Sequence, residues 1–256
     1  MFLIVSPYSR IAPIYDCTVG VPFFLRLRAS FEKLARQYDI RFCSAADIGC
    51  GTGLFACYLN LCWGAAVYAV DNSVAMLRQA ARNCRNADVC FLQQDIRCLA
   101  LPSRVDLITA NFDTLNHLKN PADLRRAFRR VAANLRPSGH FYFDILTPCQ
   151  SANGYEVFAR DHCTTRSWLH QRIQWEPRTR IIRIIARQRR ADRCTPVVES
   201  VNERAYSADE IGRWLAEAGF KIRGVHDAET LLVATGCPAR IIIIAQKAGA
   251  GCRRGR

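Results

Sequence analysis

A glycine-rich turn between a short apolar strand and an apolar helix constrains the fold of this chain more than any other segment. Glycines alternate over positions 49–53, after a strand predicted at 44–48 and at the start of a helix predicted over 53–62. Glycine is needed where the backbone turns sharply or approaches a ligand closely. Dinucleotide-binding folds place such a loop after their first strand, and residues 51–56 satisfy the relaxed NAD fingerprint. By itself the loop fits a nucleotide site, NAD included, or a tight turn without a ligand.

Strands and helices alternate along residues 1–150. The segment 1–40 is mainly helical in pattern. The strands predicted after it are 44–48, 65–70, 89–93, 105–110 and 140–146, and the helices are 53–62, 73–85 and 121–135. Ser73 is a suitable N-cap, and Pro121 suits the first turn of a helix. This alternation predicts an α/β fold with a parallel sheet covered on both faces and right-handed crossovers.

The pattern changes after residue 150. Residues 166–206 alternate apolar and polar side chains, which predicts two or three antiparallel strands with a turn near Pro177. We therefore expect 151–206 to form a small inserted sheet that acts as a lid. A capping box at Ser207 starts a helix that ends near Gly219.

Two final strands are predicted at 221–225 and 240–245, so we expect the segment 207–247 to form the last helix and strands of the core. The Gly- and Arg-rich tail 248–256 is expected to be disordered.

Composition excludes several classes of protein. Half of the 256 residues are apolar, so a sizeable core can form, yet no apolar run is long enough to cross a bilayer. The first residues lack a basic segment and break at Pro7, so no signal peptide is predicted. We expect a cytoplasmic protein, a monomer or homodimer, that does not bind membranes.

The net charge of +14 raises the question of nucleic acid. The basic residues are overwhelmingly arginine and are spread along the chain, and the two densest groups, 187–190 and 253–256, contain no aromatic residues on which bases could stack. Nucleic acid is therefore the less favoured partner, although the charge keeps it as an alternative.

Thirteen cysteines do not indicate a redox or metal function. Their number is odd, and no Cys-x-x-Cys pair occurs. Cys57 and Cys62 lie on a predicted helix and Cys90 on a predicted strand, at positions suited to small apolar residues. We predict reduced, structural cysteines and no metal site.

Three acids at or just beyond the ends of the first three strands favour a particular nucleotide. Asp47, just before the glycines, is poorly suited to a pyrophosphate but well suited to an amino-acid ammonium group. Asp71 ends the second strand, about 20 residues past the loop, where an acid can accept both hydroxyls of a ribose. Asp95 follows the third strand and can accept a hydrogen bond from an adenine amino group, while Ile96 packs on the ring.

With these residues in this order, the chain resembles class I S-adenosylmethionine (SAM)-dependent methyltransferases over roughly residues 10–247. The glycine loop, Asp71 and Asp95 match three motifs of the family. Residues 111–118 resemble its loop after strand four, and 135–141 its Leu-x-Pro-Gly-Gly turn, with Ser138 replacing a glycine.

The resemblance implies a Rossmann-like, seven-stranded, mostly parallel sheet that ends in an antiparallel hairpin, with SAM as cofactor. The cofactor-binding residues predicted on this basis are Asp47, Gly49, Cys50, Gly51, Gly53, Asp71, Asn72, Met76, Asp95, Ile96 and Asn111.

A narrower resemblance concerns the acceptor. The segment 14–16, His117 and the end of the insertion at 204–206 look like small-molecule methyltransferases, among them enzymes that methylate amino groups of sugars. In such relatives the N-terminal helix and the inserted sheet close over the acceptor. The resemblance implies in-line methyl transfer to an N or O atom of a small molecule.

Two residues are predicted to be catalytic: His117 as a general base, because its usual pKa lies near neutrality, and Tyr15, which would orient the acceptor or shield the cofactor. Substrate contacts are predicted for Asp113, Asp144, Arg204 and Tyr206. The alternatives are a structural loop histidine, a core tyrosine, ordinary strand-end acids and exposed lid residues.

Three other functions remain as alternatives. A methyltransferase for RNA or protein fits the charge, but no separate RNA-binding module is visible. An NAD-linked oxidoreductase fits the glycines, but Asp47, Asp95 and the loop at Asn111 argue against it. A non-catalytic SAM-binding protein is the third.

Overall fold

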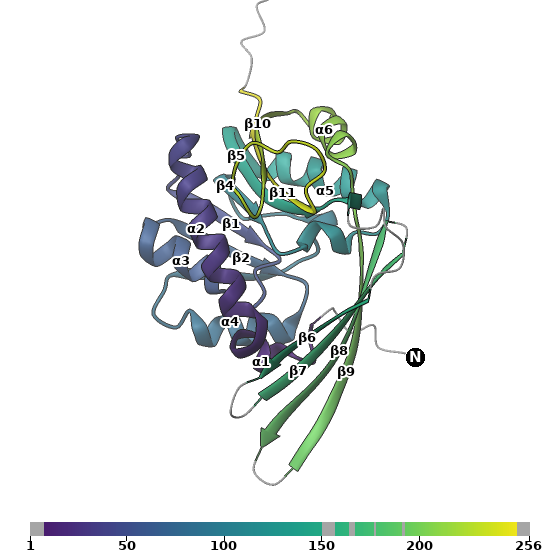
Figure 1. Ribbon diagram of the computed structural model, residues 1–256. Coiled ribbons are helices and arrows are strands. Elements are labelled where there is room, and N and C mark those ends of the chain that lie inside the picture. The colour runs from purple at the N-terminus through teal and green to yellow at the C-terminus, as the bar shows by residue number, and fades with distance from the viewer. Residues whose placement is uncertain (1–7, 150–156, 164–166, 177, 191–192, 250–256) are drawn as a thin grey trace, which may run out of the picture.

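The computed structural model describes residues 8–149, 157–163, 167–176, 178–190 and 193–249, which fold into two separate β-sheets with helices packed around the larger one (Figure 1). The larger sheet has the order β10-β11-β5-β4-β1-β2-β3. Its strands are β1 (Ser44–Ile48), β2 (Ala66–Asp71), β3 (Val89–Gln93), β4 (Val105–Ala110), β5 (Leu135–Leu146), β10 (Phe220–Asp227) and β11 (Arg240–Lys247).

All neighbours in this sheet are parallel except those of β11, which runs antiparallel to both β5 and β10. The predicted α/β fold, with seven mostly parallel strands and a final antiparallel hairpin, is confirmed. The carboxyl ends of the parallel strands therefore meet at one edge, where such sheets bind ligands.

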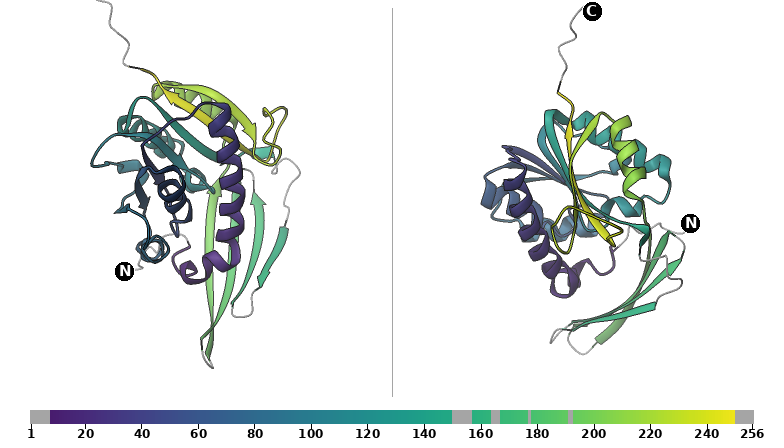
Figure 2. Two further views of the ribbon diagram at one scale, coloured as in Figure 1. Left: turned by 90° about the vertical axis from the view of Figure 1, so that its left-hand side faces the viewer. Right: turned by 45° about the horizontal axis from the view of Figure 1, so that its top comes forward.

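Helices cover both faces of the large sheet (Figure 2). They are α2 (Val21–Gln37), α3 (Leu54–Trp63), α4 (Val74–Asn83), α5 (Pro121–Asn134) and α6 (Ala208–Glu217), while the short helix α1 (Ala12–Tyr15) lies in the N-terminal segment. On one face Phe31 of α2 packs edge-on against Tyr142 of β5, with 5.2 Å between ring centroids. On the other, Phe128 of α5 packs against Phe141 and Phe143. These buried aromatic residues tie each helical layer to strand β5 of the large sheet.

Helix starts follow the local sequence signals. The Ser73 side chain accepts a hydrogen bond from the backbone N–H of Met76, and the Asn120 side chain from that of Ala122. At α6, Ser207 and Glu210 form the complete capping box. Each cap satisfies donors that the first turn of a helix leaves unpaired.

The smaller sheet has four antiparallel strands, β6 (Val157–Cys163), β7 (Ser167–Glu176), β8 (Thr179–Arg190) and β9 (Arg193–Arg204). The two or three antiparallel strands expected within 166–206 are confirmed as β7, β8 and β9, and β6 precedes them as a strand that the sequence did not predict, because its residues show no clear period-two alternation. As expected, this sheet stays separate from the central one. We call it the inserted sheet.

The N-terminal segment lies between the inserted sheet and the core. Ile11 and Ile14 pack in one apolar cluster with Leu169, Ile182 and Ile184 of the inserted sheet. A single π-helical turn, η1 (Asp16–Gly20), then joins α1 to α2. Burial of this apolar surface fixes the N-terminal segment against the inserted sheet.

The predicted strand 140–146 begins earlier, at Leu135. The sequence Pro137-Ser138-Gly139 does make a turn, with Ser138 at φ 63°, but the residues before it already pair with β4 through the Val105–Leu135 register. A shift in register follows, so one strand contains the turn as an irregularity.

Two expectations about cysteine are wrong. Cys149 and Cys237 form a disulfide, with 5.6 Å between their Cα atoms. The antiparallel pairing of β5 with β11 places residues 146 and 240 opposite each other, so the loops beyond them meet; 88 residues of intervening sequence concealed this proximity. Cys62 and Cys90 are exposed rather than buried, whereas Cys50 and Cys84 are buried.

Some expectations concern features outside the described residues: the absence of a signal peptide at residues 1–7, the turn residue Pro177 and the tail from residue 250. In the part that the structure describes, no helix is long and apolar enough to span a membrane. The described residues also contain no group of three or more His, Cys, Asp or Glu side chains arranged to hold a metal ion.

Candidate functional site

A cavity of about 450 Å³ opens at the carboxyl edge of the central sheet. It brings together twelve of the residues singled out in the sequence, which come from the glycine loop, the ends of β2 to β4 and the N-terminal segment. They are Tyr15, Asp47, Gly49, Cys50, Gly51, Asp71, Asn72, Met76, Asp95, Ile96, Asn111 and His117. Five others lie outside its lining: Gly53, Asp113, Asp144, Arg204 and Tyr206.

The glycine loop follows β1 and uses backbone conformations that favour glycine. Gly49 has φ +68°, and a Cβ atom there would overlap the side chain of Thr114. Gly53 has φ +79°, and its Cβ would lie 2.8 Å from that of Ala80 in α4. Gly53 therefore serves close packing of the loop on α4, which explains why it does not line the cavity.

Asp71 shapes the loop at the end of β2. One carboxylate oxygen accepts the N–H of Gly51 at 2.9 Å, and the other accepts the N–H of Ser73 at 2.7 Å. Burial raises the pKa of Asp71, while these backbone hydrogen bonds act in the opposite direction. The carboxylate thus holds the glycine loop and the start of α4 at one place.

Asp47 lies at the end of β1 with its side chain buried. Parallel pairing of β1 with β4 sets it opposite Thr109, whose hydroxyl donates to the carboxylate at 2.7 Å. Burial, which outweighs the opposing hydrogen bond from Thr109 and is reinforced by the nearby Asp71, raises the pKa of Asp47 to about 7. A buried acid without a cation beside it behaves in this way, and a bound cation would restore its charge.

Asp95 and Ile96 form the far end of the cavity, beside the short 3₁₀ turn η2 (Ile96–Cys98). Arg97 pairs with Asp95 at 2.6 Å and reaches Asp123 at 3.2 Å. The hydrogen bond from Arg97 holds the pKa of Asp95 below its usual value. This acid therefore stays ionised, as an acceptor, at neutral pH.

Asn111 is the polar group with the clearest need for a ligand. Its side chain is 4% exposed and lines the cavity, yet neither amide atom has a partner among the described residues. A buried amide without hydrogen bonds costs about 1–3 kcal/mol. A polar ligand in the cavity would remove that cost.

The loop after Asn111 holds two successive left-handed residues, Phe112 at φ 54° and Asp113 at φ 65°. Asp144 accepts both of their N–H groups, at 3.1 and 3.2 Å. Such conformations cost on the order of 1–3 kcal/mol each for residues other than glycine. Asp144 therefore stabilises a strained loop, and its carboxylate is not free toward the cavity.

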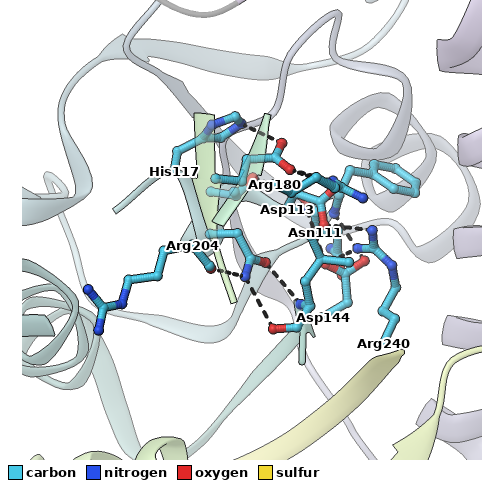
Figure 3. Close-up of polar contacts among 12 residues, drawn as sticks. Asn111, Asp113, His117, Asp144, Arg180, Arg204 and Arg240 are labelled. Atoms are coloured by element: carbon cyan, nitrogen blue, oxygen red, sulfur yellow. Dashed lines mark hydrogen bonds and ion pairs between the residues drawn. The ribbon is translucent and has the colours of Figure 1, made fainter. Parts of the chain in front are cut away.

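A buried ion network joins this loop to the inserted sheet (Figure 3). Arg180 of β8 pairs with both Asp113 and Glu203, the latter through Nε at 2.6 Å. Arg240 of β11 pairs with Asp113 at 2.6 Å and with Asp144 at 3.1 Å. Asp113 is thus already neutralised by two guanidinium groups.

His117 ends the 3₁₀ turn η3 (Thr114–His117) and lies in an aromatic cluster. The Tyr8 ring is centred 5.7 Å from that of His117 and 5.8 Å from that of Tyr15, so it contacts both rings. Burial lowers the pKa of His117 to about 4, with Asp113 and Arg180 acting in opposite directions. The imidazole is therefore neutral at physiological pH and carries one free lone pair.

Arg204 and Tyr206 support the cavity wall from outside. The Tyr206 hydroxyl donates to the carbonyl of Leu118, and Arg204 donates to that of Lys119 at 3.4 Å. Tyr206 is fully buried. These contacts fix the loop that follows His117 rather than reaching into the cavity.

The N-terminal segment closes one side of the cavity. Asp16 accepts hydrogen bonds from the Thr52 hydroxyl and, at 2.7 Å, from the Asn83 amide, and so ties η1 to the glycine loop. Phe23 of α2 stacks on Phe112 with 5.1 Å between centroids. The resulting apolar wall consists of Tyr8, Tyr15, Phe23, Phe24, Leu27 and Phe112.

Sequence reasoning missed Tyr8, Arg180, Glu203 and Arg240. A signal existed for two of them, because Glu203 is in phase with buried Val201 and Arg180 with buried Ile182. A charged residue at an inward position of an alternating strand needs a partner. Neither Tyr8 nor Arg240 stands in a comparable pattern.

Comparison with known proteins connects this site to one family. Residues 45–139 match the sequence profile of a methyltransferase domain, a segment that contains the glycine loop, Asp71, Asp95 and His117. Residues 45–139 thus carry the sequence of a methyltransferase domain. The residues present fit SAM, since an unpartnered buried amide and an acid without a cation both face the cavity.

Among curated proteins, the chain is similar to a dTDP-3-amino-3,6-dideoxy-α-D-glucopyranose N,N-dimethyltransferase of Streptomyces fradiae, with 32% identity over 138 residues. That match spans 52% of this chain and about half the length of the relative, 52%.

Two solved structures share the fold of this chain over nearly its whole length. A SAM-dependent methyltransferase from Clostridium acetobutylicum has a TM-score of 0.80 and 24% identity, covering 94% of this chain and 99% of its own. The sugar N-methyltransferase KedS8 from Streptoalloteichus has a TM-score of 0.75 and 17% identity, covering 97% and 95%. The inserted sheet and N-terminal segment are thus included in the shared architecture.

Proposed function

We propose that this methyltransferase transfers the methyl group of SAM to an amino nitrogen of a small, sugar-like acceptor. The observation that carries the proposal is the division of the cavity into two parts. The carboxylates of Asp47, Asp71 and Asp95 line it from the ends of β1, β2 and β3, whereas the N-terminal segment, the start of α2 and the loop after β4 contribute aromatic side chains. One part suits a polar nucleoside and amino acid, and the other suits the C–H faces of a compact ring.

Several of the predicted cofactor-binding residues would each make a specific contact with SAM. Asp47 would bind the ammonium group of SAM, Asp71 the two ribose hydroxyls and Asp95 the adenine amino group, with Ile96 against the ring. Asn111 would donate and accept hydrogen bonds that it lacks within the described chain. When bound, SAM supplies a methyl group already activated on a sulfonium.

The chain must then orient the acceptor and accept a proton. The acceptor nitrogen forms its bond to the methyl carbon while the sulfur–methyl bond breaks, and the nitrogen loses a proton. His117 is neutral and lines the cavity, so it can receive that proton. Tyr15 lies near it through Tyr8, so the two are parts of one aromatic cluster. Orientation of reactants of this kind contributes several kcal/mol to catalysis, typically about 7–11.

The inserted sheet and the N-terminal segment would act together as a lid. The ion network among Arg180, Asp113 and Glu203 joins the inserted sheet to the loop after β4. The apolar cluster around Ile11 joins it to the N-terminal segment. Exclusion of water suits a reaction in which the positive charge on sulfur disappears.

The name of the Streptomyces fradiae relative supports an amino sugar as acceptor. A direct test incubates the chain with SAM and three acceptors: a dTDP-linked amino sugar, the same sugar with a hydroxyl in place of the amine, and tRNA. Mass spectrometry should find a methyl group added only to the amine. Methylation of tRNA or of the hydroxyl sugar alone would overturn the proposed acceptor class.

A further inference from the structure

Phe112, in the loop after β4, is an aromatic residue held in a backbone conformation that side chains of its size rarely adopt. Its φ is 54°, in the left-handed region, where a bulky residue is a genuine outlier. Strain of this kind persists only where the surrounding structure enforces it, and it clusters at functional sites. The side chain of Phe112 therefore requires an explanation beyond packing.

Charged side chains of two neighbouring strands enforce this conformation. Asp144 of β5 accepts the N–H of Phe112 at 3.1 Å through one carboxylate oxygen and the N–H of Asp113 at 3.2 Å through the other. Arg240 of β11 pairs with Asp144 at 3.1 Å and with Asp113 at 2.6 Å (Figure 3). One guanidinium group thus fixes both the carboxylate that accepts the two N–H groups and the side chain of the second left-handed residue.

The strained backbone places the Phe112 ring in the apolar part of the cavity. The ring stacks on that of Phe23 in α2, with 5.1 Å between centroids and 30° between planes. Both residues line the cavity, and both are only partly buried, so the stacked pair is not sealed in the core. Phe112 directly follows Asn111, a proposed cofactor contact, and the same loop ends at His117, the proposed base.

We propose that the Phe112 ring is the surface on which the acceptor ring lies, and that Asp144 is the positioning residue that holds it there, an assignment that rests on the proposed function. The face of an aromatic ring is electron-rich, so it suits the C–H groups of a sugar ring. A hydroxyl group pressed against it would lose its hydrogen bonds to water. The acceptor class that fits is an amino sugar with one ring face free of hydroxyl groups, as deoxy sugars provide.

Urea unfolding tests the strain without any ligand. Glycine adopts the left-handed conformation freely and alanine does not. Both Phe112→Gly and Phe112→Ala remove the ring, so the glycine variant should unfold at the higher urea concentration. At Phe42, whose φ is not positive, the order should be reversed, because glycine loses more conformational freedom on folding. If Phe112→Ala proves the more stable variant, the backbone is not strained there and the proposal is wrong.

Acceptor kinetics at saturating SAM test the role of the ring, with a dTDP-linked amino deoxy sugar as acceptor. Phe112→Leu keeps an apolar side chain and the backbone strain but removes the aromatic face. The acceptor KM should rise at least about tenfold, while SAM affinity measured by calorimetry stays within about twofold of the wild type. Phe112→Tyr keeps the ring, so its acceptor KM should stay within about threefold of the wild-type value.

A double-mutant comparison tests the positioning role of Asp144. In Asp144→Asn one of the two backbone N–H groups faces an amide NH₂ group instead of an acceptor oxygen, so the ring is no longer held. The substitution should raise the acceptor KM in the wild-type background but add little in Phe112→Leu, where no ring remains to be positioned. If the two increases multiply, Asp144 acts on the acceptor by another route and is not the positioning residue.

Phe42→Leu is the matched control for the kinetic test. Phe42 also stacks on another ring, that of Trp63, with 5.2 Å between centroids, and it is partly buried but does not line the cavity. Its acceptor KM should match that of the wild type. If the wild type methylates the amino sugar and Phe112→Leu has an unchanged KM, the role of Phe112 is refuted while the proposed function stands. If the wild type methylates no amine, the proposed function fails and the role of Phe112 fails with it.

Discussion

Binding of SAM should depend on pH through Asp47. In the free protein, burial raises the pKa of Asp47 to about 7. The ammonium group of SAM favours the carboxylate, so binding below this pH must release the proton that Asp47 holds. Affinity should therefore be highest near pH 7.5 and fall toward tenfold per unit below pH 6. The ionised fraction falls from about three quarters at pH 7.5 to about 3% at pH 5.5, which predicts an affinity loss of about 25-fold.

Isothermal titration calorimetry measures both parts of this prediction. Affinity is followed between pH 5.5 and 8, and proton release is read from the binding enthalpy in buffers of different ionisation enthalpy. Asp47→Asn should bind more weakly at pH 8 and lose the pH dependence. In Thr109→Val the lost hydrogen bond should move the midpoint to higher pH, because that bond lowers the pKa of Asp47. A wild-type affinity that is constant from pH 5.5 to 8 would refute the assigned role.

Three further predictions concern the ribose site, the base and the lid. Asp71→Ala should lower SAM affinity by at least about tenfold, since two charge-assisted hydrogen bonds of about 1.5–3 kcal/mol each are removed; unchanged calorimetric affinity in a folded variant would disprove the contact. His117→Phe should lower kcat by roughly 10²–10⁴-fold while SAM affinity stays near wild type, so a loss confined to SAM binding would move His117 out of the acceptor site. Amide hydrogen exchange in β7–β9 should slow when cofactor and acceptor are both bound, and exchange that is indifferent to ligands would rule out the lid.

Local signals predicted the framework of the fold well. The strand at 89–93 and that at 105–110 coincide with the observed β3 and β4, because both are short, largely apolar runs bounded by clear breaks in polarity. The caps at Ser73 and Ser207 also lie where the sequence indicates, since capping depends on neighbours within one turn. Strands and helix caps that depend only on neighbouring residues can therefore be predicted from the sequence alone.

Contacts between residues that are far apart in the sequence could not be predicted in the same way. Asp113 meets Arg180 across 67 positions, and the disulfide joins cysteines 88 residues apart. Such contacts depend on how the inserted sheet folds back on the loop after β4, which no local pattern records. Asp113 and Asp144 looked like free acids at strand ends, whereas folding surrounds both with arginine.

The central claim is that this cavity binds SAM, and calorimetry tests it most directly. SAM, or its demethylated product, should bind the wild-type chain with one site per chain, and NAD under the same conditions should give no comparable heat. Tight binding of NAD together with no binding of SAM would contradict the whole account.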